Sequence, residues 1–257
     1  MPTTLPVSDG AEVERLLRAG EFSGYQRITL PDGRVIPGTD RSPTADLIYP
    51  ADLTGQSVLD VGCYYGFFLH EAIRRGAARA VGIEADPERC RIAGTLARLW
   101  DGKVEVHGGR LEEVPLVEKF DVVLFLNVLH HVRDPLAVVR RLAAHCRGTL
   151  VIEFRQPHDP QFVRECFHPH TSVGPRRSLP ARLWYGALTT VGARVAEWVA
   201  GRMPLVGVGA VEYHRTWFFS RAAFRNAFQA HNGLFESVEF RDSLTRGQAL
   251  AFCRCRP

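Results

Sequence analysis

Residues 57–76, Ser-Val-Leu-Asp-Val-Gly-Cys-Tyr-Tyr-Gly-Phe-Phe-Leu-His-Glu-Ala-Ile-Arg-Arg-Gly, decide the fold of this chain. Val58, Leu59 and Val61 form a short apolar run, as expected of a strand buried in a parallel sheet. Gly62 and Gly66 then bracket a tight turn, and the apolar spacing after the turn is that of a helix. Glycine lets the backbone approach a ligand closely, so this strand, turn and helix predict a nucleotide-like ligand. No lysine followed by Ser or Thr comes after the glycines, which excludes a P-loop.

The next segment supports the same kind of site. Residues 78–84 predict a second strand that ends in the acid Glu84, and Asp86 with Pro87 predicts the start of a helix. A carboxylate at this strand end holds the ribose diol in nucleotide-binding α/β folds.

These residues resemble a known family. Asp60-Val-Gly-Cys-Tyr-Tyr-Gly66, followed by Gly82-Ile-Glu84, resembles the first two motifs of class I S-adenosylmethionine-dependent methyltransferases. The alternative is another Rossmann-like domain that binds NAD or nothing. The resemblance implies S-adenosyl-L-methionine as cofactor, with these cofactor-binding residues: Asp60, Gly62, Tyr64, Gly66, Glu84, Ala85, Arg110, Leu111 and Asn127. Members of the family often have an acid for the adenine amino group where this chain has Arg110, so we expect backbone groups to read adenine here.

Strands and helices alternate along the chain, which favours a doubly wound parallel sheet. We expect an α/β fold with a Rossmann-like doubly wound seven-stranded sheet, an N-terminal cap and a lid insertion before the sixth strand. The last two strands, 235–240 and 249–254, are close enough to pair as an antiparallel hairpin, and the family resemblance implies an antiparallel last strand. The ligand crevice lies at the carboxyl ends of the strands. This rule places one rim along Gly62, Glu84, Arg110, Asn127 and Glu153.

The expected organisation has four parts: a helix and hairpin cap (1–50), the cofactor-binding core (51–155), a lid or substrate insertion (156–215), and a C-terminal helix with the final two strands (216–257). The leader either closes over the cofactor or packs as a cap. The insertion is too apolar for a disordered linker. We interpret it as a substrate lid that is partly helical over 181–199, with a homodimer contact as the alternative.

Methyl transfer requires that donor and acceptor are oriented, that water is excluded, and that the acceptor's proton is removed. The catalytic candidates are His130, Glu153, His214 and Tyr65. A neutral imidazole is a suitable base near neutral pH, and aromatic rings accommodate cations such as a sulfonium. For His131 we favour a role in capping a turn or packing.

Several cationic and polar residues follow the fifth strand or lie in the lid. The substrate-binding candidates are Arg155, His158, Arg176, Arg177, Glu212, Tyr213 and Arg215. Because arginine's planar fork suits carboxylate and phosphate oxygens, these residues predict an anionic acceptor, phosphorylated in one version of the hypothesis. The alternative is that the arginines pair with surface acids such as Glu165 and Glu197.

A second resemblance is narrower. The glycine-turn motif together with residues 129–136, Leu-His-His-Val-Arg-Asp-Pro-Leu, is similar to the tRNA wobble-uridine carboxymethyltransferase group and its relatives over about 28–155. Lysine occurs only at Lys103 and Lys119. This scarcity and the apolar lid favour C- or O-methylation of a small molecule of specialised metabolism. A tRNA-modifying (carboxy)methyltransferase and a catalytically inactive cofactor-binding partner subunit are the alternatives.

Composition sets the remaining bounds. The 257 residues are 46% hydrophobic and 23% charged with a net charge of +4, so nucleic-acid binding is allowed but not indicated. We expect no signal peptide and no membrane association. The six cysteines are scattered, which favours a reduced cytoplasm over a disulfide scaffold. We expect no metal, and we assign the pair Cys253-Arg-Cys255 to ordinary packing.

Overall fold

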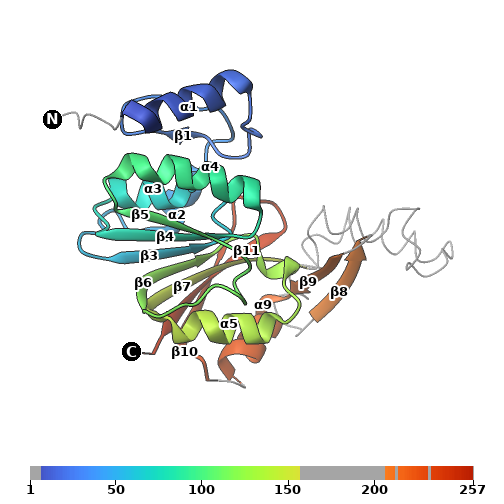
Figure 1. Cartoon of the computed structure of the whole chain (residues 1–257). Helices are drawn as coiled ribbons and strands as arrows, with labels where there is room; N and C mark the ends of the chain where they lie inside the picture. The colour runs from blue at the N-terminus through green and yellow to red at the C-terminus, as the bar shows by residue number, and fades with distance from the viewer. Residues whose placement is uncertain (1–6, 157–205, 212–213, 231–232, 257) are drawn as a thin grey trace. The chain divides into compact units, whose positions relative to one another are not determined.

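The computed structural model describes residues 7–156, 206–211, 214–230 and 233–256 (Figure 1). It divides into two compact units, Met1–Leu124 with His145–Arg147 and Phe125–Ala144 with Gly148–Pro257. The helix expected over 181–199 lies outside the described residues, as do these substrate-binding candidates: His158, Arg176, Arg177, Glu212 and Tyr213.

The seven-stranded sheet expected from the sequence is confirmed, with the strand order β10-β11-β7-β6-β3-β4-β5. β3 pairs in parallel with β4 and β6, and β4 pairs in parallel with β5. The last strand, β11, runs antiparallel to both β7 and β10, as the family resemblance implied. The strands are β3 (Ser57–Val61), β4 (Arg79–Glu84), β5 (Val104–Gly108), β6 (Phe120–Phe125), β7 (Cys146–Arg155), β10 (Phe235–Asp242) and β11 (Gln248–Cys255).

In the first unit, helices α3 (Phe67–Arg74) and α4 (Pro87–Ala97) pack on the parallel strands. The predicted cap of α4 is present, because the Asp86 carboxylate accepts a hydrogen bond from the Arg89 N–H at 2.9 Å. η1 (Arg98–Trp100) follows α4.

The leader forms helix α1 (Val7–Ala19), which lies against α4, and the two-stranded hairpin of β1 (Ile28–Thr29) and β2 (Val35–Ile36). Helix α2 (Ser42–Ile48) was not predicted from the sequence. This helix has seven residues, and Ala45 and Ile48 are its buried residues. Two apolar positions in so short a segment do not show a helical period in the sequence.

The second unit contains η2 (Leu129–His131), α5 (Pro135–Ala144), α9 (Arg221–Arg225) and a π-helical turn, η3 (Asn226–Ala230). Phe154 of β7 stacks on Phe224 of α9 with ring centroids 4.7 Å apart, and Phe224 contacts Phe228 at 4.6 Å. Burying each phenylalanine contributes about 1.5–3 kcal/mol, so these rings hold α9 and η3 on the strand.

One hairpin of the second unit differs from the sequence prediction. β8 (Val206–Val211) and β9 (His214–Phe219) form an antiparallel hairpin at the end of the segment that we expected to be lid, and β9 crosses the boundary expected at residue 215. Gly207 and Gly209 interrupt the alternation of side chains that would have indicated a strand. The lid assignment of the preceding residues remains a prediction.

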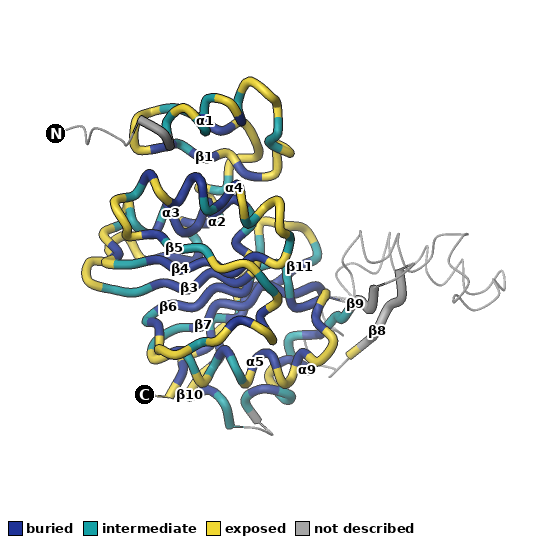
Figure 2. The backbone as a smooth tube through the Cα atoms, in the orientation of Figure 1, coloured by how far each residue is buried: buried dark blue, intermediate teal, exposed yellow. Residues whose placement is uncertain are grey.

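Strands β3, β4, β6, β7 and β11 are buried along most of their length, whereas the edge strands β5 and β10 and much of the leader's surface are more exposed (Figure 2). Cys253 and Cys255 are both buried in β11, which agrees with the packing role predicted for them. None of the described helices is long and apolar enough to cross a membrane.

Candidate functional site

The glycine turn after β3 lies at the carboxyl ends of the parallel strands. The Gly62 N–H donates to the Ile83 carbonyl at 2.8 Å, and β4 itself ends at Glu84. Gly62 and Gly66 have φ values of +80° and +89°, which residues with a side chain rarely adopt. Gly66 also has little spare space, since a Cβ there would lie 3.2 Å from the His70 ring. The turn therefore requires glycine for both its conformation and its packing.

Glu84 is buried and holds the turn in place. One carboxylate oxygen accepts from the Tyr64 N–H at 2.9 Å, and the other accepts from the Asp86 N–H at 3.0 Å. An ionised carboxylate has about four lone-pair sites, so acceptor capacity remains for the hydroxyls of a ribose diol. Glu84 thus fits the predicted role and also links the glycine turn to the start of α4.

Asp60 is buried at the end of β3, and its Oδ2 atom has no hydrogen-bond partner in the described part of the chain. Burial, and then the nearby charge of Glu84, raises the pKa of Asp60 to about 8. Buried polar atoms are rarely left unpaired in proteins, so this oxygen indicates a missing hydrogen-bond partner. S-adenosylmethionine carries hydroxyl and amino donors, and the residues of this cradle fit it. We use the name cofactor cradle for Asp60, residues 62–66 and Glu84.

A residue that sequence reasoning missed, Gln26, reaches the turn from the leader. Its side-chain oxygen accepts from the Tyr65 N–H at 3.2 Å and the Phe67 N–H at 3.3 Å, and its amide nitrogen donates to the Cys63 carbonyl at 3.4 Å. No motif marks a glutamine at this position. The leader therefore packs against the turn in this structure.

The two tyrosines of the turn also contact the leader. Tyr65 is buried, lies edge-on to Phe22 at 5.7 Å and donates its hydroxyl to the Glu21 carbonyl at 3.5 Å. The Tyr64 hydroxyl bonds with that of Ser23. Burial raises the pKa of Tyr65, so its hydroxyl keeps its proton near neutral pH and is poorly suited to act as a base.

The predicted adenine-side residues lie at the ends of adjacent strands. Ala85 follows β4 and is exposed, and Leu111 is buried shortly after β5. Arg110 is exposed, and its Nε lies 3.9 Å from a carboxylate oxygen of Glu112. The Arg110 backbone carbonyl accepts from the Glu113 and Val114 N–H groups.

The second unit contains a separate group of polar residues, which we call the histidine cluster: Asn127, His130, His131, Glu153, Arg155, Ser243 and Gln248. The register of β11 on β7 places Gln248 opposite Arg155. Gln248 is buried, and its amide nitrogen donates to the Asn127 side-chain oxygen at 3.5 Å. Asn127 has a φ of +58°, a left-handed conformation that asparagine tolerates better than most residues.

The two histidines of the cluster differ in environment. His130 is buried and His131 is exposed, with ring centroids 3.9 Å apart. Burial, followed by the charges of His131 and Arg155, lowers the pKa of His130 to about 2. His130 is therefore neutral at physiological pH, and this low pKa argues against it as the proton acceptor.

The acid of the cluster is tied to a loop after β10. Glu153 is buried and accepts a hydrogen bond from the Ser243 hydroxyl. β7 continues beyond it to Arg155, which is also buried, so both predicted residues lie near the end of the strand. The candidates His214 and Arg215 lie in β9, and their side chains fall outside the described part of the chain.

Among the described residues, no group of three or more potential ligands gathers in a way that could hold a metal ion. The indole N–H of Trp217 donates to the Val132 carbonyl at 2.9 Å, which ties β9 to the turn that carries the histidines.

Comparison with known proteins gives consistent matches. A family model described as "Methyltransferase domain" matches residues 43–234. Ubiquinone biosynthesis O-methyltransferase of Neisseria meningitidis serogroup C is 40% identical over 98 residues, which are 36% of this chain and 40% of that protein. tRNA U34 carboxymethyltransferase of Shewanella amazonensis is 38% identical over 108 residues, 39% of this chain and 32% of that protein. This chain thus spans well under half the length of these curated relatives.

A solved structure, the N-terminal domain of EvdMO1 in the presence of SAH and D-fucose, aligns over 96% of this chain and 97% of its own length. The TM-score is 0.60 and the sequence identity is 19%, so this likeness shows the fold alone.

Proposed function

Because this chain belongs to the methyltransferase domain family, we propose that it transfers a methyl group from S-adenosylmethionine to a small-molecule acceptor of specialised metabolism. The family match confirms the enzyme class and the cofactor that were predicted from the sequence. The observation that carries the proposal is the cofactor cradle: a glycine turn in the left-handed region, the buried Glu84 that holds it, and the unpartnered oxygen of Asp60.

The proposed acceptor is small and anionic, and phosphorylation would supply its charge. The Neisseria relative is named for ubiquinone biosynthesis, and a small molecule is the acceptor that such a name implies for that protein. Within this chain, the buried Arg155 supplies a cation in the histidine cluster, and a guanidinium suits carboxylate or phosphate oxygens. Methylation of oxygen or of carbon is compatible with these residues.

S-adenosylmethionine, when bound, supplies the methyl group and an electron-poor sulfonium that accepts the bonding electron pair. Asp60 and Glu84 offer acceptor oxygens to its polar groups, and the glycine turn allows close backbone approach. In this proposal the exposed His131 takes the acceptor's proton. Neutral, buried His130 packs against the His131 ring. This exchanges the roles that we predicted from the sequence for the two histidines.

The test has a binding step and a turnover step. Calorimetry with S-adenosylhomocysteine should show stoichiometric binding. Incubation with methyl-labelled cofactor and fractionated extracts should place the label in a small anionic metabolite. Label that enters no fraction despite tight binding would contradict an enzymatic role and support the inactive partner subunit.

A tRNA-modifying (carboxy)methyltransferase is the second candidate, favoured by the 38% identity to the Shewanella relative. It predicts label in tRNA rather than in small molecules. It also predicts binding that weakens steeply with salt, because phosphate contacts release counterions. The same labelling experiment therefore separates the two functions.

We also propose that the protein acts in the cytoplasm, without membrane attachment, with a homodimer as a further possibility to test. The six cysteines are scattered along the sequence, which favours a reducing compartment over a disulfide scaffold. Size-exclusion chromatography with light scattering would measure the oligomeric state.

A further inference from the structure

We propose that Gln26 is a positioning residue for cofactor binding, which fixes the glycine turn in the conformation that receives the cofactor. The inference rests on the proposed function in one respect, namely that the ligand of the turn is S-adenosylmethionine. It assigns a function to the N-terminal leader, which is to brace the turn from outside the sheet.

Three hydrogen bonds connect Gln26 to the backbone of the turn. Its side chain accepts from Tyr65 and Phe67 and donates to Cys63, so it contacts the backbone on both sides of Tyr64 and again at the first residue of α3. The side chain is buried, so water does not readily replace these bonds. One amide thus joins three points over five residues of the turn.

Helix α3, which follows the turn, has no side-chain cap at its own N-terminus. The first N–H groups of a helix have no partners within the helix and are usually satisfied by the side chain at the N-cap. The N-cap of α3 is Gly66, which has no side chain to offer. Gln26 satisfies the Phe67 N–H from a distant part of the chain, so the turn keeps its glycine without leaving this donor unpaired.

The backbone of the turn is also strained at Tyr64. This residue has a φ of +58°, which is unfavourable for a residue with a side chain. Such conformations persist where the surroundings impose them. Glu84 holds the Tyr64 N–H, while Gln26 holds the Cys63 carbonyl before it and the Tyr65 N–H after it. Without Gln26, the backbone loses the bonds that hold the Cys63 carbonyl and the Tyr65 N–H on either side of Tyr64.

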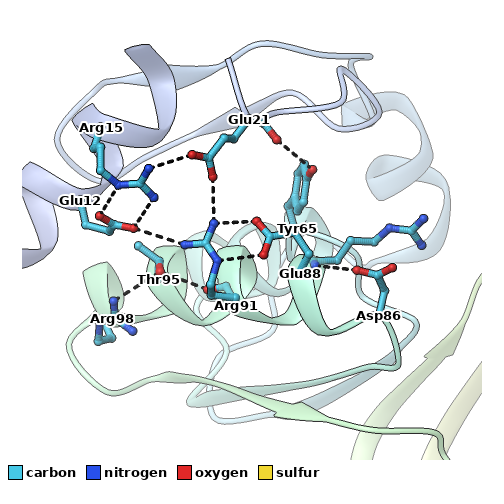
Figure 3. A network of polar contacts seen from close by, with 10 residues as sticks. Glu12, Arg15, Glu21, Tyr65, Asp86, Glu88, Arg91, Thr95 and Arg98 are labelled. Atoms are coloured by element: carbon cyan, nitrogen blue, oxygen red, sulfur yellow. Dashed lines mark hydrogen bonds and ion pairs between the residues drawn. The ribbon is translucent and has the colours of Figure 1, made fainter. Parts of the chain in front are cut away.

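The leader is placed so that it presents Gln26 in a fixed position. Gly38 lies so close that a Cβ there would be 2.5 Å from the Gln26 carbonyl, and the Arg27 N–H donates to the Thr39 carbonyl at 2.9 Å. Two acids of the leader that precede Gln26, Glu21 and Glu12, pair with Arg91 of α4 at 2.9 Å and 3.3 Å (Figure 3). These contacts attach the leader to the same unit that carries the turn.

The test replaces Gln26 by methionine, which has similar length but forms none of the three bonds. We expect the Kd for S-adenosylhomocysteine and the KM for S-adenosylmethionine to rise at least tenfold, while kcat at saturating cofactor changes less than twofold. The matched control is Gln229→Met in the other unit, because the Gln229 side chain makes one bond among the described contacts, at 3.4 Å to the Glu236 carbonyl. Its Kd should stay within twofold of the wild type.

Hydrogen exchange separates positioning from general destabilisation. In Gln26→Met the Tyr65 and Phe67 amides should exchange at least tenfold faster, while core amides of β3 keep their protection. If the methionine variant does not fold, Gln26→Glu is used instead. It keeps both accepting bonds but cannot donate to the Cys63 carbonyl when ionised, and it should raise Kd by a smaller factor.

A folded Gln26→Met protein with unchanged Kd, or, where the methionine variant does not fold, a Gln26→Glu protein with wild-type Kd, would overturn the proposal. Failure of the proposed function would look different, because the wild type itself would then not bind S-adenosylhomocysteine. The exchange rates at Tyr65 and Phe67 would still test the brace.

Discussion

The cofactor cradle and the histidine cluster are built in different ways. The cradle comes mainly from residues 60–84, and its backbone is held by Glu84 and Gln26. The histidine cluster joins Asn127 to Gln248 and Glu153 to Ser243, residues that are 121 and 90 positions apart. The sequence named Asn127 and Glu153 as candidates, but it gave no sign of their distant partners Gln248 and Ser243.

The two regions also show one electrostatic effect with opposite signs. Burial disfavours the charged form of any group. It therefore raises the pKa of the Asp60 acid in the cradle and lowers the pKa of the His130 base in the cluster. Both groups are driven toward neutrality, and this difference can be tested by substitution and by pH.

The largest expected effect is the loss of cofactor binding in Glu84→Ala. The change removes a charge-assisted bond to the Tyr64 N–H of the turn and another to the Asp86 N–H at the start of α4, each worth about 1.5–3 kcal/mol, together with the proposed ribose contact. The Kd for S-adenosylhomocysteine should rise about a hundredfold or more in calorimetry. Glu88→Ala is the control, since Glu88 is an exposed acid that pairs only with Arg91 in the described contacts. Equal affinity in the Glu84 variant would show that the cradle does not depend on this acid.

The next effect concerns the histidines. If His131 accepts the proton, His131→Gln should lower kcat about a hundredfold, the usual range for a general base. His130→Gln should lower kcat less than tenfold, because a group with a pKa of about 2 does not accept protons near neutral pH. Steady-state kinetics at saturating acceptor measures both. A larger loss in His130→Gln would restore the role that the sequence suggested for it.

The floor of the cradle should be sensitive to one added methyl group. A Cβ at Gly82 would lie 2.7 Å from both the Cys63 sulfur and a Leu69 methyl carbon. Gly82→Ala should therefore lower the free energy of unfolding by about 2 kcal/mol, as overpacked cores do. Gly94→Ala is the matched control in α4, where no atom lies within 4 Å. It should raise that free energy by up to about 1 kcal/mol, by helix propensity. Urea titration measures the free energy of unfolding of both variants, and an equal change in the two would contradict the packing argument.

Stability should depend on pH in different windows for the two regions. His130 has a pKa of about 2 when folded and about 6.5 when unfolded, so the unfolded chain binds a proton that the folded chain rejects. The stability it contributes is complete above pH 6.5 and is lost as the pH falls. Between pH 6 and 5 the titration of His130 should lower the free energy of unfolding by about 1 kcal/mol. His130→Gln should not show this decrease.

Asp60 acts in the opposite direction. Its pKa is about 8 when folded and about 3.9 when unfolded, so folded protein binds the extra proton and loses stability as pH rises toward 8. Asp60→Asn should therefore stabilise the protein at pH 8 more than at pH 5. Urea unfolding at pH 5, 6, 7 and 8 checks both variants. If the free energies of unfolding of His130→Gln and Asp60→Asn changed with pH in the same way, the opposite pKa shifts of the two groups would be refuted.

The smallest effect is expected at Arg91, although it has the most ion pairs in Figure 3. Exposed pairs contribute little because water and salt screen them. Arg91→Gln should shift the unfolding temperature by less than about 3 °C and leave the Kd for S-adenosylhomocysteine unchanged. A tenfold loss of affinity would mean that the charge network, rather than Gln26, fixes the leader on the turn.

The sheet, the glycine turn, the role of Glu84 and the methyltransferase family could all be predicted from the sequence. These follow from local patterns: a buried strand is a short apolar run, and a left-handed turn requires glycine at Gly62 and Gly66. The cap at Asp86 was predictable for the same reason, because a helix end is satisfied by its own neighbours.

Which side chains support that framework depends on the packing of the folded chain. The hydrogen bond between Gln26 and Tyr65 spans 39 positions, and the low pKa of His130 depends on burial that the packing imposes. Sequence patterns record how each segment meets solvent and its near neighbours along the chain. Desolvation and hydrogen bonds between distant segments depend on how the chain packs, so the brace and the protonation of the histidine cluster became visible only in the folded molecule.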